Sequence, residues 1–281
     1  MCRMISIISN SDNLLSSDLI KYYVIESDKS LLKQSKFNPS RFQKDGWGIG
    51  YYKDGKTFIF KSPNPIYNEL SLVNNKIEKV NSNFFLIHIR NASNPRQIEK
   101  DKLIGIENTQ PFSYQNYIFS HNGTLSIVDE VFENLGKYKK YVKGLNDSEV
   151  LFWHFIKHID AYADVKTALY TMRDEINTIW VSVKKDYRKL KKPYNGINVF
   201  VYDGSTFYAL CDFKMEKETY SLMTPKWEYG SYAFRKEKSC VVISSEPCDY
   251  KEWKKIDPVS IVTIEKNLNI RIESIDKIVE R

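Results

Sequence analysis

The sequence predicts an α+β protein in which helices pack outside two β-sheets. Strand-like apolar runs occur towards both ends of the chain, and three helix-like segments lie between them. Two Asp-Gly pairs, Asp54-Gly55 and Asp203-Gly204, separate strand-like runs and are typical of tight hairpin turns. No internal repeat or low-complexity linker interrupts the pattern. We therefore expect one domain over residues 2–281, with 266–281 as a C-terminal extension.

The first half of the chain predicts mainly strands. Apolar or alternating runs of four to eight residues indicate strands, and apolar residues spaced three or four apart indicate helices. The expected strands are Met4–Ile8, a hairpin over Trp47–Lys61, Phe84–Arg90 and Tyr117–His121. The expected helices are Asp18–Lys33 and Ile66–Ile77.

The second half predicts three helices and then a return to strands. The helices are expected at Ser126–Leu135, Ser148–Ala161 and Val165–Leu190. Asn146, Asp147 and Ser148 can each cap the second of them. The later strands are expected at Ile197–Tyr202, Thr206–Cys211, Ser239–Ser244, Ser260–Glu265 and Asn269–Ile272.

The composition is that of a globular protein, with 42% hydrophobic and 14% aromatic residues in 281. No apolar run approaches the roughly 20 residues that span a bilayer, so we expect a cytoplasmic protein without a membrane partner. The net charge of +7 permits nucleic-acid binding, but no nucleic-acid motif accompanies it. A solvated lysine-rich surface is the preferred interpretation, and we expect no nucleic-acid partner.

The cysteines and histidines do not indicate a metal site. The four cysteines form no Cys-x-x-Cys pair. His154 and His158 are four residues apart on an expected helix, but no glutamate follows His154 as in His-Glu-x-x-His. We interpret them as chance neighbours and expect neither a metal nor a cofactor.

Cys2 is the first candidate for chemistry. Removal of Met1 would leave Cys2 with a free α-amino group beside its thiol. The thiolate is the nucleophilic form, and an α-amino group with a pKa of about 7.7 can accept the thiol proton. One residue would then supply both nucleophile and base. The alternative is that a cysteine at position 2 is incidental.

The second candidate is His121-Asn122-Gly123, which follows an apolar strand. An Asn-Gly pair commonly marks a turn. It can also provide an oxyanion hole, in which the Asn122 amide and the Gly123 N–H hold a developing negative oxygen. Loss of one such donor typically costs roughly 10²–10³ in rate.

Three further motifs contain candidate binding residues. Arg90 ends a strand, where an arginine is commonly a surface ion-pair partner but can also clamp a carboxylate with two hydrogen bonds. Asp147 can cap the helix that follows it or can hold a substrate ammonium. Asp45-Gly46-Trp47-Gly48 is typical of a turn followed by a strand.

Together and in this order, the motifs resemble those of class II glutamine amidotransferases, especially the stand-alone branch. They are Met-Cys-Arg at the start, Asp-Gly-Trp-Gly, His-x-Arg-x-Ala-Ser, Glu107-Asn108-Thr109-x-Pro111-Phe112, Ser-His-Asn-Gly, Asp-Ser-Glu and Ser245-Glu246-Pro247. The resemblance covers about residues 2–265 and implies the four-layer αββα sandwich of the N-terminal-nucleophile (Ntn) hydrolases. Asn94-Pro95 departs from the His-Gly that synthase-fused members have there.

The resemblance implies catalytic roles for three residues. Cys2 would attack the side-chain amide of glutamine or of a γ-glutamyl compound, while Asn122 and Gly123 stabilise the oxyanion. Ammonia would leave, a γ-glutamyl thioester would form on Cys2, and water would release glutamate.

It also implies a substrate-binding set. Arg90 would hold the substrate α-carboxylate and Asp147 its α-ammonium, with Ser93 in the same site. Trp47 and Gly48 would line the site near the nucleophile. No metal or cofactor takes part.

The resemblance leaves two functions open. The first is hydrolysis of glutamine or a γ-glutamyl compound, with a separate synthase or peptidase subunit as partner. The alternative is a catalytically silent binding or regulatory subunit with the same fold. The presence of every expected site residue favours the enzyme.

Overall fold

The computed structural model describes residues 2–10, 13–38, 42–213, 220–221 and 223–275. Within them, strands form one sheet of seven and one of six, and every strand pairing is antiparallel.

The first sheet has β1 at its centre. Its seven strands, in spatial order, are β11 (Lys254–Ile256), β9 (Tyr232–Lys236), β10 (Cys240–Ser244), β1 (Arg3–Ser9), β4 (Phe84–Ile89), β2 (Trp47–Lys53) and β3 (Lys56–Ser62). All seven residues of β1 are buried. Because side chains alternate between the faces of a strand, Ile5 and Ile7 point to one face while Met4 and Ile8 point to the other.

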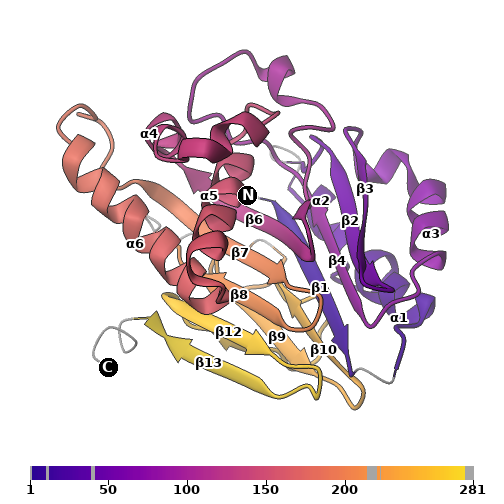
Figure 1. The fold of residues 1–281 in the computed structure, drawn as a ribbon. Coiled ribbons are helices and arrows are strands. Elements are labelled where there is room, and N and C mark those ends of the chain that lie inside the picture. The colour runs from indigo at the N-terminus through magenta and orange to yellow at the C-terminus, as the bar shows by residue number, and fades with distance from the viewer. Residues whose placement is uncertain (1, 11–12, 39–41, 214–219, 222, 276–281) are drawn as a thin grey trace.

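The second sheet lies face to face with the first (Figure 1). Its strands, in spatial order, are β13 (Ile270–Ser274), β12 (Ser260–Ile264), β8 (Phe207–Cys211), β7 (Tyr194–Tyr202), β6 (Tyr117–Leu125) and β5 (Phe112–Tyr114). Short β5 covers only the beginning of β6, so the later residues of β6 have no strand on that side.

Helices cover the outer face of each sheet (Figure 1). The first group is α1 (Ser17–Lys21), α2 (Leu31–Lys36) and α3 (Leu70–Glu78), and the second is α4 (Val128–Glu133), α5 (Asp147–Tyr162) and α6 (Val165–Val183). Short segments of π- or 3₁₀-helix lie at Tyr22–Glu26, Ile66–Asn68, Lys100–Leu103 and Gly136–Tyr141.

Three hydrophobic cores separate four layers. One core joins α1–α3 to the first sheet, a second lies between the two sheets, and a third joins α4–α6 to the second sheet. The fold prediction, a four-layer αββα sandwich of two antiparallel sheets, is therefore confirmed.

Several expected elements end at other residues. The expected helix Asp18–Lys33 is broken after Glu26, because Ser27 Oγ donates to the Cys248 carbonyl and Ser30 caps α2. The expected helix Val165–Leu190 ends at Val183, before a polar lysine-rich segment.

The end of the chain also differs in detail from the expectation. The expected strand Asn269–Ile272 is β13, at Ile270–Ser274, and it forms the edge of the second sheet although it lies within the expected C-terminal extension. Residues 276–281 lie outside the described part of the chain. The pattern did not predict β5, β9 or β11, of which β5 and β11 have only three residues each.

None of the helices in the described ranges combines the length and apolarity that crossing a membrane requires.

Gly48 allows the first sheet to approach the loop before β5. A Cβ at Gly48 would lie 2.3 Å from the Gln110 carbonyl oxygen and 2.7 Å from that of Phe60. Both atoms belong to main chain, so neither can move away cheaply. We expect Gly48→Ala to lower the free energy of unfolding by at least about 2 kcal/mol, measured by urea denaturation.

Gly105→Ala is the matched control, because a Cβ there meets the flexible end of the Glu107 side chain at 3.0 Å. Equal losses of stability in the two variants would show that the close main-chain contacts at Gly48 do not cause the loss in Gly48→Ala.

Candidate active site

The candidate residues meet at one end of the two sheets. Cys2 directly precedes β1 and Arg90 directly follows β4; in this pair of strands Arg3 lies opposite Ile89. Cys2 and Arg90 therefore occupy the next position in the register. Asn122 lies in β6 of the opposing sheet and contacts Cys2 directly.

The Asn122 amide holds the main chain of Cys2. The Cys2 N–H donates to Asn122 Oδ1 at 3.1 Å, and Asn122 Nδ2 donates to the Cys2 carbonyl at 3.3 Å. Asn122 thus lies within a strand, and the interpretation of the Asn-Gly pair as a turn does not apply.

The Cys2 thiol contacts Asn91, a residue that the sequence did not single out. Cys2 Sγ accepts from the Asn91 N–H at 3.3 Å and lies 3.5 Å from the Asn91 carbonyl. Burial raises the pKa of the thiol, whereas the Asn91 N–H and the Arg90 guanidinium lower it by less. The protonated thiol therefore dominates at neutral pH, and nucleophilic attack needs a base.

The Gly123 N–H points to the open edge of β6. The main chain of His121 exchanges hydrogen bonds with the Gln110 side chain, away from β7. Since strand residues alternate, Gly123 presents its N–H to the same side. Its opposite residue, Ile197, gives its own N–H to the Asp212 carbonyl, so the two are not hydrogen-bonded to each other.

A glycine is required at this position. A Cβ on Gly123 would lie 1.9 Å from the Gly196 carbonyl oxygen, and its φ is +156°. Two residues further on, the Leu125 N–H donates to Asp147 Oδ2 at 2.9 Å. The Gly123 N–H is therefore a fixed donor, next to the carboxylate of Asp147 along the same edge.

Arg90 is a buried cation. Its side chain donates through Nη1 to the carbonyls of Leu103 at 2.6 Å and Asp45 at 3.3 Å. In the described part of the chain it forms no ion pair, so it is not the surface ion-pair partner that a strand-end arginine commonly is. The other N–H groups of its guanidinium can donate hydrogen bonds to a carboxylate.

Asp147 is a buried anion. Its two oxygens accept from Ser93 Oγ at 3.0 Å and from the Leu125 N–H at 2.9 Å. Asn146 caps α5 instead, by accepting from the Glu149 N–H. No basic side chain pairs with Asp147 among residues whose placement is described.

The site thus contains two opposite buried charges that do not neutralise each other directly. Both act on Cys2: Arg90 lowers the pKa of its thiol and Asp147 raises it. A buried charge is costly unless it is paired, and a zwitterion would pair with both.

The Trp47 side chain does not line the site, whereas Gly48, which has no side chain, lies with its main chain against the loop that carries Gln110. Trp47 is fully buried in the core against α1–α3 and donates its indole N–H to Glu69 at 2.7 Å. It shares a sheet face with Ile89, the face opposite to Cys2. The expectation for Trp47 is wrong, because the strand starts at this residue and alternation turns its side chain outward.

The rest of the Asp-Gly-Trp-Gly motif supports Arg90. Asp45 N–H donates to the Arg90 carbonyl, Arg90 N–H donates to the Gly46 carbonyl, and the Asp45 carboxylate accepts from the Ala92 N–H at 2.8 Å. Asp45 therefore positions the loop that carries Arg90 and Ser93.

Asn108 joins another loop to α5. Its Oδ1 accepts from the N–H groups of Leu145 and Asn146 and from the Asn146 amide. The sequence indicated the Glu107-Asn108-Thr109 motif as part of the family pattern, but it did not predict which groups Asn108 binds.

Two antiparallel sheets packed face to face between two layers of helices form the Ntn type of fold. A family model for glutamine amidotransferases class-II matches residues 31–274. The chain therefore belongs to the class II glutamine amidotransferase family, as its motifs predict.

The chain is also similar to individual proteins. The chain is 25% identical over 233 residues to an uncharacterized protein of Methanocaldococcus jannaschii, covering 76% of this chain and 59% of that protein. It is 22% identical over 259 residues to probable glutamine amidotransferase DUG3 of Saccharomyces cerevisiae, covering 79% and 70%. A glutamine aminotransferase class-II domain protein from Silicibacter pomeroyi shares the fold, with a TM-score of 0.64, 16% identity and coverage of 97% and 99%.

His88 lies next to this site, and the pH dependence of folding stability tests whether its buried ring is neutral. The ring is fully buried between the sheets, and neither of its nitrogens has a hydrogen-bond partner of good geometry among the residues that the structure describes. Burial, with the nearby Arg90 and His121, lowers the pKa of His88 to about 3. The unfolded chain therefore binds a proton here below about pH 6.5 and the folded chain does not.

Folding stability should consequently fall as the pH drops below about 6.5. His88 should account for about 1.4 kcal/mol of loss between pH 7.5 and 5.5, and His88→Leu should remove that share. Urea denaturation at the two pH values measures it. The same pH dependence in His88→Leu and wild type would contradict a neutral buried ring.

Proposed function

We propose that this protein hydrolyses the side-chain amide of glutamine or of a γ-glutamyl compound. The observation that carries the proposal is the pair of buried opposite charges, Arg90 and Asp147, close to Cys2. An amino-acid head group has one carboxylate and one ammonium. Arg90 would bind the first and Asp147 the second, with Ser93 holding Asp147 in place.

The proposed chemistry starts with removal of Met1. The Cys2 nitrogen then becomes an amine, which takes the thiol proton, and the thiolate attacks the amide carbon. The amine returns a proton to the leaving nitrogen, so ammonia departs and a γ-glutamyl thioester remains. Water attacks the thioester, releases glutamate and restores the thiol.

Two donors would stabilise the oxyanion. The Gly123 N–H points to the open edge of β6 and is already fixed by the backbone. The Asn122 amide is 3.3 Å from the Cys2 carbonyl, a long hydrogen bond that it can exchange for one to the substrate oxygen.

The alternative function, a catalytically silent binding or regulatory subunit, depends on Met1. If Met1 stays, the Cys2 nitrogen is an amide and cannot take the thiol proton. The raised pKa of the buried thiol would then leave the head-group site able to bind but not to turn over substrate. A separate synthase or peptidase subunit as partner fits either function: in the first it would use the ammonia or amine that is released, and in the second it would be the enzyme that the silent subunit regulates.

We expect Arg90→Lys to raise KM by about 10–100-fold, with a smaller effect on kcat. Lysine keeps the charge but loses the two-pronged geometry that matches a carboxylate. Cys2→Ala should abolish turnover. Glutamate release from glutamine and from γ-glutamyl-p-nitroanilide measures both effects.

Arg96→Lys is the control for Arg90, because Arg96 lies on the same loop but pairs with Asp129 at the surface. Turnover that survives Cys2→Ala, or equal KM changes in the two arginine variants, would refute the assignment.

A further inference from the structure

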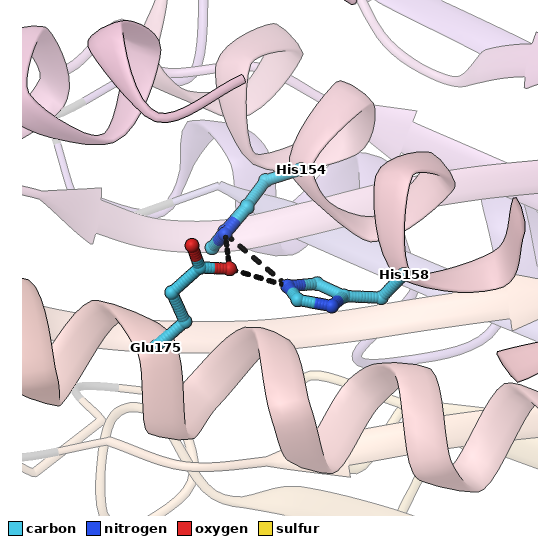
Figure 2. A group of neighbouring side chains, drawn as sticks. All are labelled: His154, His158 and Glu175. Carbon is cyan, nitrogen blue, oxygen red and sulfur yellow. Dashed lines mark hydrogen bonds and ion pairs between the residues drawn. The ribbon is translucent and has the colours of Figure 1, made fainter. Parts of the chain in front are cut away.

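Two histidines and a glutamate converge between α5 and α6 (Figure 2). His154 and His158 are one helical turn apart on α5, and Glu175 comes from α6. From the sequence, the histidines are chance neighbours. The structure corrects this, because the packing of the two helices adds a third side chain that spacing along one helix cannot reveal.

Three atoms of the cluster lie close enough together to contact one ion. Glu175 Oε2 is 2.8 Å from Nε2 of each histidine, and the two Nε2 atoms are 3.3 Å apart. The centre of this triangle lies about 1.7 Å from each atom, from the same three distances. An ion about 2.05 Å from all three, the usual distance for Zn²⁺, would therefore sit roughly 1 Å above their plane.

The donor set also suits a cation. Imidazole nitrogens and a carboxylate oxygen are ligands that Zn²⁺ and related metals prefer. In the metal-free chain the two Nε2 atoms share hydrogen bonds with Glu175 Oε2, so an ion would replace those protons when it binds.

Lys157 positions the carboxylate. Its Nζ donates to Glu175 Oε1 at 2.7 Å and lies 3.0 Å from Oε2, and it also donates to the Asn134 carbonyl. Lys157 thus contacts both carboxylate oxygens, and Oε2 also faces both rings. The like charge of Lys157 lowers affinity for a cation, so the site should bind more weakly than one with four protein ligands.

We propose that His154, His158 and Glu175 bind one divalent transition-metal ion of the Zn²⁺ type, with water as the fourth ligand. The ion would join α5 to α6. Asp147 begins α5, seven residues before His154, which is about 10 Å along the helix. The metal would therefore stabilise the helix that carries one wall of the candidate active site, without entering the chemistry at Cys2.

The test is metal binding by the full-length chain with Cys2→Ser, so that the candidate nucleophile cannot supply a thiolate. Calorimetry with Zn²⁺ and visible absorption with Co²⁺ should each show one ion per chain, and Zn²⁺ should raise the melting temperature. Glu175→Gln keeps the shape of the side chain and His158→Gln keeps a polar group. Each should weaken binding at least about 10-fold.

Glu133→Gln is the matched control, since Glu133 is an exposed glutamate of α4 outside the cluster. Circular dichroism establishes that each variant is folded. The proposal is overturned if the Cys2→Ser chain binds no stoichiometric ion, or if Glu175→Gln and Glu133→Gln bind the metal equally well. Because Cys2 is absent from the assay, this outcome is separate from the fate of the hydrolase proposal.

Discussion

The reciprocal hydrogen bonding between Asn122 and the main chain of Cys2 is the contact on which the site depends. It joins the N-terminal end of β1, at the centre of one sheet, to β6 in the other. The position of the thiol is therefore set by the packing of the two sheets. The same strand, β6, presents the Gly123 N–H, so the candidate nucleophile and the proposed oxyanion donor are both positioned from this strand. This arrangement is the preorganisation that electrostatic catalysis requires.

The two buried charges depend on loops that the sheets hold in place. Asp45 and Gly46 bind the main chain around Arg90, and Ser93 carries the connection onward to Asp147. Each charge has neutral hydrogen-bond partners and no direct ion pair in the portion of the chain that is described, although the nearby Asp45 and Asp147 carboxylates favour the charge of Arg90. Such groups cost stability in the free protein, and a zwitterionic ligand recovers that cost on binding. The site is therefore better suited to an amino-acid head group than to an ion of a single sign.

The sequence predicted the parts of the structure that depend on local pattern. The apolar run expected at Phe84–Arg90 is β4, which ends at Ile89, and the motif order identified the family. The missed features depend on distant contacts. Asn108, nearly forty residues away, receives the hydrogen bonds of Asn146, the actual cap of α5. Trp47 points away from Cys2 because of the register of β2 against β4, which a turn motif does not encode. The third side chain of the α5–α6 cluster comes from a different helix.

The central claim is that the sulfur and the amine of one terminal residue act together on a γ-glutamyl amide. The most direct measurement is the mass of the N-terminal peptide after active protein reacts with a glutamine-analogue diazoketone. The account predicts a peptide that begins at Cys2 and carries the label on its sulfur. An active preparation that keeps Met1, or a label on another residue while Cys2 stays unmodified, would contradict it.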